Sequence, residues 1–205
     1  MKQLPLLRAT KIRKEHGGSL LLGKRRKKRP LCLKSPHHLV LKSDFAFGPR
    51  SLLWHRPLIH RVIAKAKKRF DIKVYEIGIA SNHIHLAAKG KSRSNLQNFF
   101  RVVAGHIAQE ILREFPIRPE ERSRGGAPKA RSTSAGGAPT AAKTKTREKE
   151  NKFWQTRIYS RIVRWGRDWI AVKKYIIQNG LEALGLIPYK ARTQKHKFKV
   201  HLDTS

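Results

Sequence analysis

The sequence predicts an α+β protein: an antiparallel sheet of the split β-α-β-β-α-β type with helices packed on it, followed by one further helix. Two observations support this prediction. Residues 72–80 and 83–89 are short apolar runs joined by a two-residue connection, which is typical of a β-hairpin. Residues 51–70 and 92–115, on either side of this pair, place apolar side chains at helical spacing.

The segments that flank the hairpin complete the first part of the pattern. "HHLVLKS" (37–43) is short and apolar and is predicted to form the first strand. The first helix is expected to begin near Pro57, because proline is tolerated in a first helical turn and not further in. The second helix has Ser92 at the N-cap position, and its apolar stripe comprises Leu96, Phe99, Val103, Ala104, Ile107 and Ile111.

The chain changes character after residue 117. From residue 118 to residue 152 it has no Val, Ile, Leu, Met or aromatic side chain, so apolar burial cannot offset the entropy cost of ordering it. We therefore predict a flexible insertion at 118–150. A strand at 153–165 and a helix at 166–185 follow, with Asn179 and Gly180 expected to end the helix. The apolar arc of this helix, expected to face the sheet, comprises Trp169, Ile170, Val172, Ile176 and Ile177.

The charge balance predicts a polyanionic partner. The chain has 47 Lys and Arg against 13 Asp and Glu, a formal net charge of +34. Such an excess repels itself unless it is neutralised, and nucleic acid is the usual polyanion, with an anionic membrane surface as the weaker alternative. The single cysteine excludes an intrachain disulfide, and no apolar run approaches the roughly 20 residues that span a bilayer. We expect a cytoplasmic, nucleoid-associated protein without a membrane partner.

The basic residues divide the chain into three parts. Residues 1–34 are predicted to be a basic N-terminal arm, residues 35–189 the folded domain with the insertion at 118–150, and residues 190–205 a basic tail. The arm and the tail are expected to contact the nucleic-acid backbone. The residues that we predict for this role are Lys24, Arg25, Arg26, Lys27, Lys28, Arg29, Lys190, Arg192, Lys195 and Lys197.

"NHIHL" (82–86) is the stretch with the clearest chemical content. On a strand, His83 and His85 project to the same face and Ile84 to the other. Two imidazoles at this spacing can bind one metal ion, although buried core histidines are an equally reasonable interpretation. Two nitrogens do not complete a metal site. Because acidic residues are few, amide and water oxygens have to be considered as the other ligands.

Tyr175 and Asn179 are one helical turn apart and therefore share a face of the last predicted helix. That face borders the apolar arc, so it would lie at the edge or surface of the sheet. Each residue also has a simpler interpretation. Tyr175 can be a boundary tyrosine with its ring inside and its hydroxyl outside, and Asn179 can be part of an Asn-Gly helix end.

Together, these motifs resemble those of a known family. "NHIHL" is similar to the histidine–hydrophobic–histidine motif of HUH single-strand nucleases, and "YIIQN" (175–179) is similar to the Tyr-Ile-x-x-Asn pattern of REP-associated tyrosine transposases. "FWQTRIYSRIVRW" (153–165) also resembles the aromatic approach to that helix in the family. The resemblance covers residues 31–115 and 152–189 and implies a ferredoxin-like fold.

The resemblance also implies a function. His83, His85 and Asn179 would be ligands of Mg²⁺ or Mn²⁺, and Tyr175 would attack DNA to form a 5′-phosphotyrosine. The implied substrate is single-stranded DNA with hairpins, cut and rejoined by a monomer or homodimer. Trp154, Trp165 and Trp169 are candidates for stacking on unpaired bases. Two alternatives remain: a non-catalytic protein of the same fold that binds structured DNA or RNA, and a basic RNA-associated protein with incidental histidines.

Overall fold

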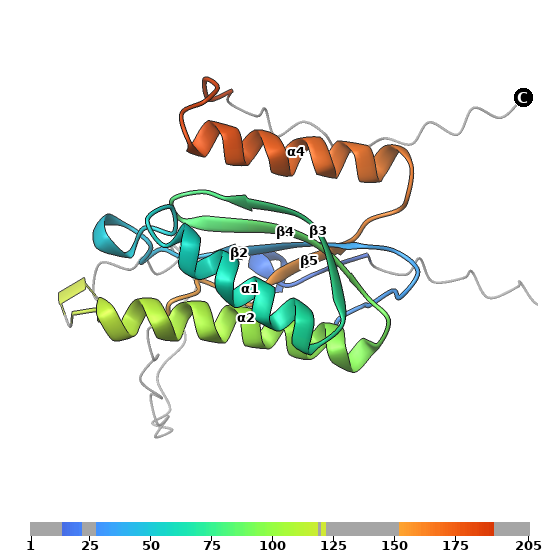
Figure 1. Ribbon diagram of the computed structural model, residues 1–205, viewed down its shortest axis with the longest axis horizontal. Helices are drawn as coiled ribbons and strands as arrows, with labels where there is room; N and C mark the ends of the chain where they lie inside the picture. The colour runs from blue at the N-terminus through green and yellow to red at the C-terminus, as the bar shows by residue number, and fades with distance from the viewer. Residues whose placement is uncertain (1–13, 22–27, 119, 122–151, 191–205) are drawn as a thin grey trace, which may run out of the picture.

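The computed structural model describes residues 14–21, 28–118, 120–121 and 152–190. In this part of the chain one antiparallel sheet lies between two layers of helix, with α1 and α2 on one face and α4 on the other (Figure 1). The strands are β1 (Glu15–His16), β2 (His37–Lys42), β3 (Ile72–Ile79), β4 (His83–Gly90) and β5 (Tyr159–Ile162). The helices are α1 (Arg56–Arg69), α2 (Arg93–Glu114) and α4 (Arg167–Ala183), with short 3₁₀ turns at Gly18–Leu21 and Gly48–Arg50.

The strand order across the sheet is β1-β5-β2-β4-β3. Without β1, the elements follow one another as β-α-β-β-α-β, and every pair of neighbouring strands is antiparallel. The predicted ferredoxin-like fold with an additional helix that carries the tyrosine is therefore confirmed. The sequence did not indicate β1, which pairs Glu15 with Arg161 and His16 with Ser160 at the edge of the sheet.

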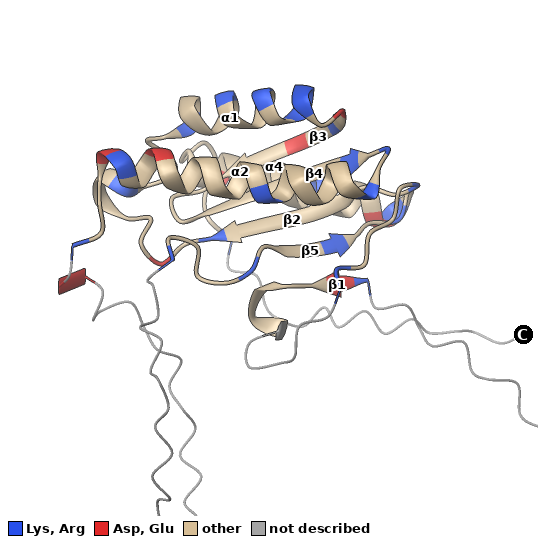
Figure 2. Ribbon diagram, turned by 90° about the horizontal axis from the view of Figure 1, so that it is seen from below, with Lys and Arg blue, Asp and Glu red and all other residues tan. Residues whose placement is uncertain are grey.

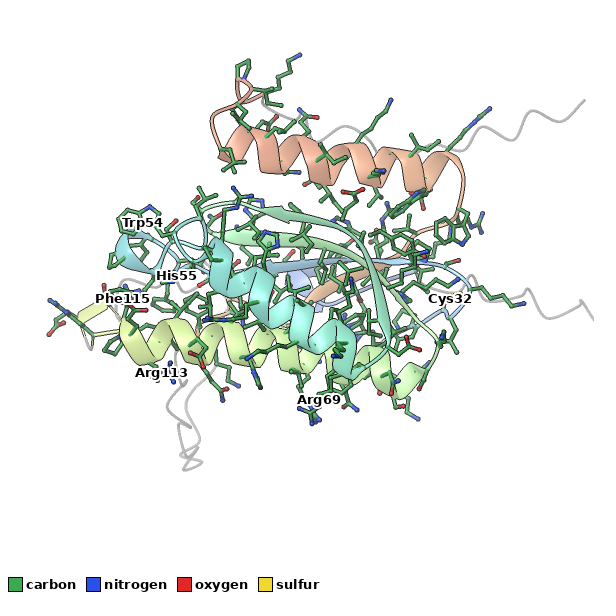
Figure 3. All side chains as sticks on the ribbon, viewed as in Figure 1. Cys32, Trp54, His55, Arg69, Arg113 and Phe115 are labelled. Atoms are coloured by element: carbon green, nitrogen blue, oxygen red, sulfur yellow. The ribbon has the colours of Figure 1, made fainter. Side chains whose placement is uncertain are left out.

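The main core lies between the sheet and the layer of α1 and α2. All six residues of the predicted stripe on α2 are buried there, and Ser92 accepts a hydrogen bond from the backbone N–H of Asn95, as expected of an N-cap. At the other end of this layer, the rings of His55 and Phe115 pack with their centroids 5.8 Å apart (Figure 3). Both helices match their predicted bounds within about one residue, with the first beginning at Arg56.

The helix α4 covers the other face of the sheet and differs from expectation in two ways. Val172 and Ile176 are buried, but Ile170 and Ile177 are 53% and 41% exposed, so the predicted arc was wrong for these two isoleucines. The helix is rotated toward the side of Tyr175 and Asn179, because the sheet surface beneath it is partly polar. The helix also continues past Asn179 and Gly180 to Ala183, so the predicted Asn-Gly end was wrong.

Close backbone packing explains why α4 continues through Gly180. Gly78 on β3 lies so near α4 that a Cβ atom at this position would be 2.7 Å from the carbonyl oxygen of Ile176. Gly180 faces the same point, since a Cβ there would be 3.8 Å from the Cα of Gly78. The glycine in "NG" therefore serves as a packing surface within α4.

The segment 153–165 is a strand only at Tyr159–Ile162, which is shorter than predicted. Its first residues are irregular but still tied to the sheet. The N–H of Gln155 donates to the carbonyl of Lys42, and the Ser43 hydroxyl donates to the carbonyl of Phe153. The chain thus crosses the end of β2 before it enters β5.

One predicted phosphate-binding residue is held inside the fold. The guanidinium of Arg29 donates to the Ser160 hydroxyl and to the carbonyl of Ile158 at 2.9 Å, and it lies over the ring of Phe100. Burial, and then the positive charge of Arg157, lower its pKa to about 10. Arg29 is therefore engaged by protein groups, and its phosphate contact stays a prediction.

Several other predictions fall outside the described residues. They are the insertion from residue 122 to residue 150 and the nucleic-acid contacts of Lys24, Arg25, Arg26, Lys27, Arg192, Lys195 and Lys197. Lys28 and Lys190 lie within the described ranges. None of the helices that the structure describes has the length and apolar character needed to cross a membrane.

Candidate metal and nucleophile site

The register of β4 places the two motif histidines on the face of the sheet that α4 covers. Their ring centroids are 4.8 Å apart, while Ile84 between them is 1% exposed in the main core on the opposite face. His85 is paired with Val40 on one side and with Gly78 on the other, so it lies in the middle of the sheet. The prediction that the two imidazoles share a face is confirmed.

Tyr175 on α4 lies against His85. Its ring centroid is 5.1 Å from that of His85, with the two planes at 76°. Asn179, one turn further along α4, is 7% exposed, and its side-chain N–H donates to the carbonyl of Tyr175 at 2.7 Å. Because the amide nitrogen is engaged in this way, Oδ1 is the atom with which Asn179 would bind a cation. The fold therefore brings His85 and Tyr175, 90 residues apart, into ring contact.

The hydrogen bonds of the two histidines are consistent with metal binding through Nε2. Nδ1 of His83 is 2.7 Å from Oδ1 of Asn82, and Nδ1 of His85 is 3.1 Å from Nε2 of His38. A metal-binding histidine usually donates its second ring N–H to a neighbouring acceptor, which fixes the tautomer and the orientation of the ring. Each ring has such a neighbour at Nδ1, so Nε2 is the nitrogen with which each would bind a metal ion.

The remaining ligands would be oxygens. Among the residues that the structure describes, no group of three or more His, Cys, Asp or Glu side chains could hold a metal ion. An amide oxygen suits Mn²⁺ or Mg²⁺, and the two imidazoles favour Mn²⁺ of these two ions. Three protein ligands would leave positions for water and phosphate oxygens. The donor set therefore fits a catalytic divalent ion better than a closed structural zinc site.

His38 on β2 belongs to the same cluster and was not among the residues predicted from the sequence. Besides its contact with His85, its ring packs edge-on against Tyr175 with centroids 5.9 Å apart. Burial, and then the positive charge of Arg161, lower the pKa of His38 to about 4, so the ring is neutral at pH 7. The doublet "HH" at 37–38 in a short apolar strand was the signal that could have found it.

A second tyrosine lies beside the first. Tyr159 on β5 packs edge-on against His38 with centroids 6.5 Å apart. Burial, and then the negative charge of Glu15, raise the pKa of Tyr159 to about 12, which disfavours its phenolate. Nearby, Arg161 forms an ion pair with Asp168 at 2.9 Å, and Asp168 also accepts from the backbone N–H of Arg164. These contacts tie the start of α4 to β5.

The tryptophans divide between core and surface. The indole N–H of Trp154 donates to the carbonyl of Ala104, and the ring packs against the main core. Trp165 is 47% exposed and lies in edge-on contact with Tyr75 and Trp169, with the ammonium of Lys89 5.7 Å from its ring centroid. Of the three tryptophans predicted to stack on bases, Trp165 is the one whose exposure suits that role.

The family comparison agrees with the motifs. Residues 52–127 match the family model described as "Transposase IS200 like", which confirms the resemblance for this segment. The matched segment includes α1, the β3–β4 hairpin with both histidines, and α2. It spans fewer than half of the 205 residues and ends before Tyr175 and Asn179. A comparison with the curated proteins gives no match.

Two solved structures are similar to this chain. One is a REP-associated tyrosine transposase bound to a REP hairpin, with 12% identity and a TM-score of 0.48 over 77% of this chain and 73% of that chain. The other is a candidate transposase from Deinococcus radiodurans R1, with 10% identity and a TM-score of 0.39 over 76% of this chain and 98% of that chain. At these identities and TM-scores, neither structure adds to the assignment of function.

Proposed function

We propose that this protein is a metal-dependent transposase that nicks and rejoins single-stranded DNA at hairpin sequences, with Tyr175 as its nucleophile. The observation that carries the proposal is the ring contact between Tyr175 and His85, which joins the two motifs across the sheet. The match of residues 52–127 to IS200-like transposases supports the same class of enzyme.

The geometry supports a division of labour within the site. His83 and His85 would hold a divalent ion with Oδ1 of Asn179. Such an ion, when bound, withdraws charge from a phosphate oxygen and so favours attack at phosphorus. The packing of α4 on β3 holds Tyr175 beside the histidines, and this placement lowers the entropy cost of the reaction.

Tyr175 would react through its phenolic oxygen. That oxygen forms a bond to phosphorus while the bond from phosphorus to the 3′ oxygen breaks, which gives a 5′-phosphotyrosine and a free 3′-hydroxyl. The proton that the phenol loses balances the proton that the 3′ oxygen gains. The reverse reaction with another 3′-hydroxyl rejoins strands without ATP. The raised pKa of Tyr159 disfavours the phenolate of that second tyrosine.

Positive charge on the folded domain supports DNA as the partner. Lys and Arg side chains occur along the helices and at the strand ends, well beyond the predicted arm and tail (Figure 2). Three of them, Lys67, Lys68 and Arg69, occupy the last turn of α1. Trp165 and Lys89 offer an aromatic ring and a cation on the same face of the sheet as the histidines. A single strand bound there would gain both phosphate neutralisation and base stacking.

The direct test is a gel assay for a covalent protein–DNA adduct. The protein would be mixed with labelled single-stranded hairpin libraries in Mg²⁺, Mn²⁺ or EDTA, as wild type, Tyr175→Phe and Tyr159→Phe. We expect a metal-dependent adduct with the wild type and with Tyr159→Phe, and none with Tyr175→Phe. The Tyr159→Phe variant controls for the loss of a hydroxyl from a second tyrosine, whose ring also contacts His38.

Two outcomes would contradict the proposal. An adduct that persists in Tyr175→Phe and disappears in Tyr159→Phe would assign the nucleophile to β5. Tight hairpin binding without an adduct in any metal would identify a non-catalytic binding protein with the same fold.

A further inference from the structure

His38 makes a contact that the proposed reaction leaves unexplained. Its Nε2 is 3.1 Å from Nδ1 of His85, and the two rings stack with centroids 5.2 Å apart and planes at 27°. His38 is 7% exposed and His85 is 4% exposed. A direct hydrogen bond between two buried imidazoles requires that one nitrogen carries a proton and the other does not.

Metal binding would decide which ring donates. If His85 binds a cation through Nε2, its Nδ1 carries the proton and donates it, so Nε2 of His38 has to accept. The His85 ring is then fixed in the tautomer and the rotation that direct Nε2 to the metal. Asn82 would be the acceptor for His83, because its side-chain oxygen Oδ1 is 2.7 Å from Nδ1 of that ring. Each of the two proposed ligands thus has its own acceptor.

We propose that His38 is a positioning residue that holds His85 in the orientation and tautomer needed for metal binding. This inference rests on the proposed metal site. His38 would act on the metal site through His85, because its Nε2 is shared with Nδ1 of that ring. Its edge-on contact with Tyr175, at 5.9 Å between centroids, connects the ligand and the nucleophile through one side chain.

The neighbouring histidine provides a matched control. His37 is also fully buried, but it lies on the opposite face of β2, where its Nε2 accepts a hydrogen bond from the backbone N–H of Cys32. Its ring packs against Phe100 in the main core, with centroids 6.2 Å apart. A substitution at His37 therefore disturbs a buried histidine of the same strand without touching the proposed metal site.

The experiment measures Mn²⁺ affinity without any reaction. The full chain would be titrated with Mn²⁺, and free Mn²⁺ would be followed by electron paramagnetic resonance, for the wild type and for His38→Phe, His38→Gln and His37→Phe. We expect His38→Phe to weaken binding about 10- to 100-fold, because it keeps the ring volume and loses the acceptor. His38→Gln should recover most of the affinity, because its amide oxygen can accept from Nδ1. His37→Phe should bind Mn²⁺ as the wild type does.

The possible results separate this inference from the proposed function. Equal affinity of the wild type and His38→Phe would refute the role of His38 and leave the metal site standing. Equal losses in His38→Phe, His38→Gln and His37→Phe would refute it as well, because the effect would then come from general destabilisation. A wild type that does not bind Mn²⁺ would refute the metal site itself.

Discussion

Gly78 is the position at which a single methyl group should separate the two halves of the proposed site. A Cβ atom there would be 2.7 Å from the carbonyl oxygen of Ile176 and 3.1 Å from its Cγ2. Since comfortable carbon contacts are about 3.5–4.0 Å, Gly78→Ala requires α4 to move away from β3 by roughly 0.5–1 Å. The nearest atom belongs to the backbone, so no side-chain rotation can relieve the clash. Ile176 adjoins Tyr175, and Gly78 is the cross-strand partner of His85.

The expected effect of Gly78→Ala is larger on chemistry than on folding. Overpacking of this kind costs about 1–3 kcal/mol of stability, which a thermal melt followed by circular dichroism would report as a shift of a few degrees. A displacement of about 1 Å at a reacting atom can cost about 100-fold in rate. We therefore expect the rate of adduct formation to fall by about 10- to 100-fold while unfolding stays cooperative.

Gly105→Ala is the matched control. It is also a glycine-to-alanine change, but a Cβ atom at this position of α2 meets nothing within 4 Å. Alanine should stabilise the helix by roughly 0.5–1 kcal/mol and leave the adduct rate unchanged. If Gly78→Ala formed adduct at the wild-type rate, the close approach of α4 to β3 would not be what positions Tyr175.

Two further predictions concern the fold. Arg50, which is buried, donates to both carboxylate oxygens of Glu121 and lowers the pKa of that carboxyl from 4.5 to about 2. The stabilisation is therefore complete above pH 4.5 and is lost as the pH falls toward 2. In thermal melts, the melting temperature of Glu121→Gln should lie below that of the wild type at pH 6 and approach it at pH 2. A difference in melting temperature that stays constant with pH would contradict this. Deletion of residues 122–148, which contain no Val, Ile, Leu, Met or aromatic residue, should leave cooperative thermal unfolding intact, and its loss would show that this segment takes part in the fold.

The helix α2 was predicted best, because its buried residues face a single apolar layer. It packs on the main core, so its apolar spacing reports its orientation directly. On α4 the spacing of apolar residues predicted the wrong buried face. The face of the sheet that α4 covers presents His85, Tyr159 and Gly78 along with apolar groups. Polar contacts and backbone packing set the rotation of this helix, and neither contributes to an apolar periodicity.

The candidate site was predictable to the extent that it lies within short motifs. His83 and His85 share a face because strand geometry requires it, and the Tyr-Ile-x-x-Asn pattern led to Tyr175 and Asn179. The contact of His38 with His85 depends on the register between β2 and β4, two strands 47 residues apart at these positions. No local pattern encodes such a register. The strand β1 was missed for the same reason, because two residues in a basic segment have no period of their own.

On the proposed mechanism, the position of β5 and α4 in the chain determines when the protein could first act on DNA. Both elements follow the segment from residue 118 to residue 152, whereas the histidines precede it. A ribosome that has synthesised only the first 150 residues has produced the two proposed histidine ligands. It has not yet produced Tyr175, Asn179 or β5, one of the two strands that pair with β2. The nascent chain therefore lacks its proposed nucleophile until residue 175 has been synthesised. On the proposed mechanism, an incomplete or prematurely terminated product could not cut the single-stranded DNA that it meets.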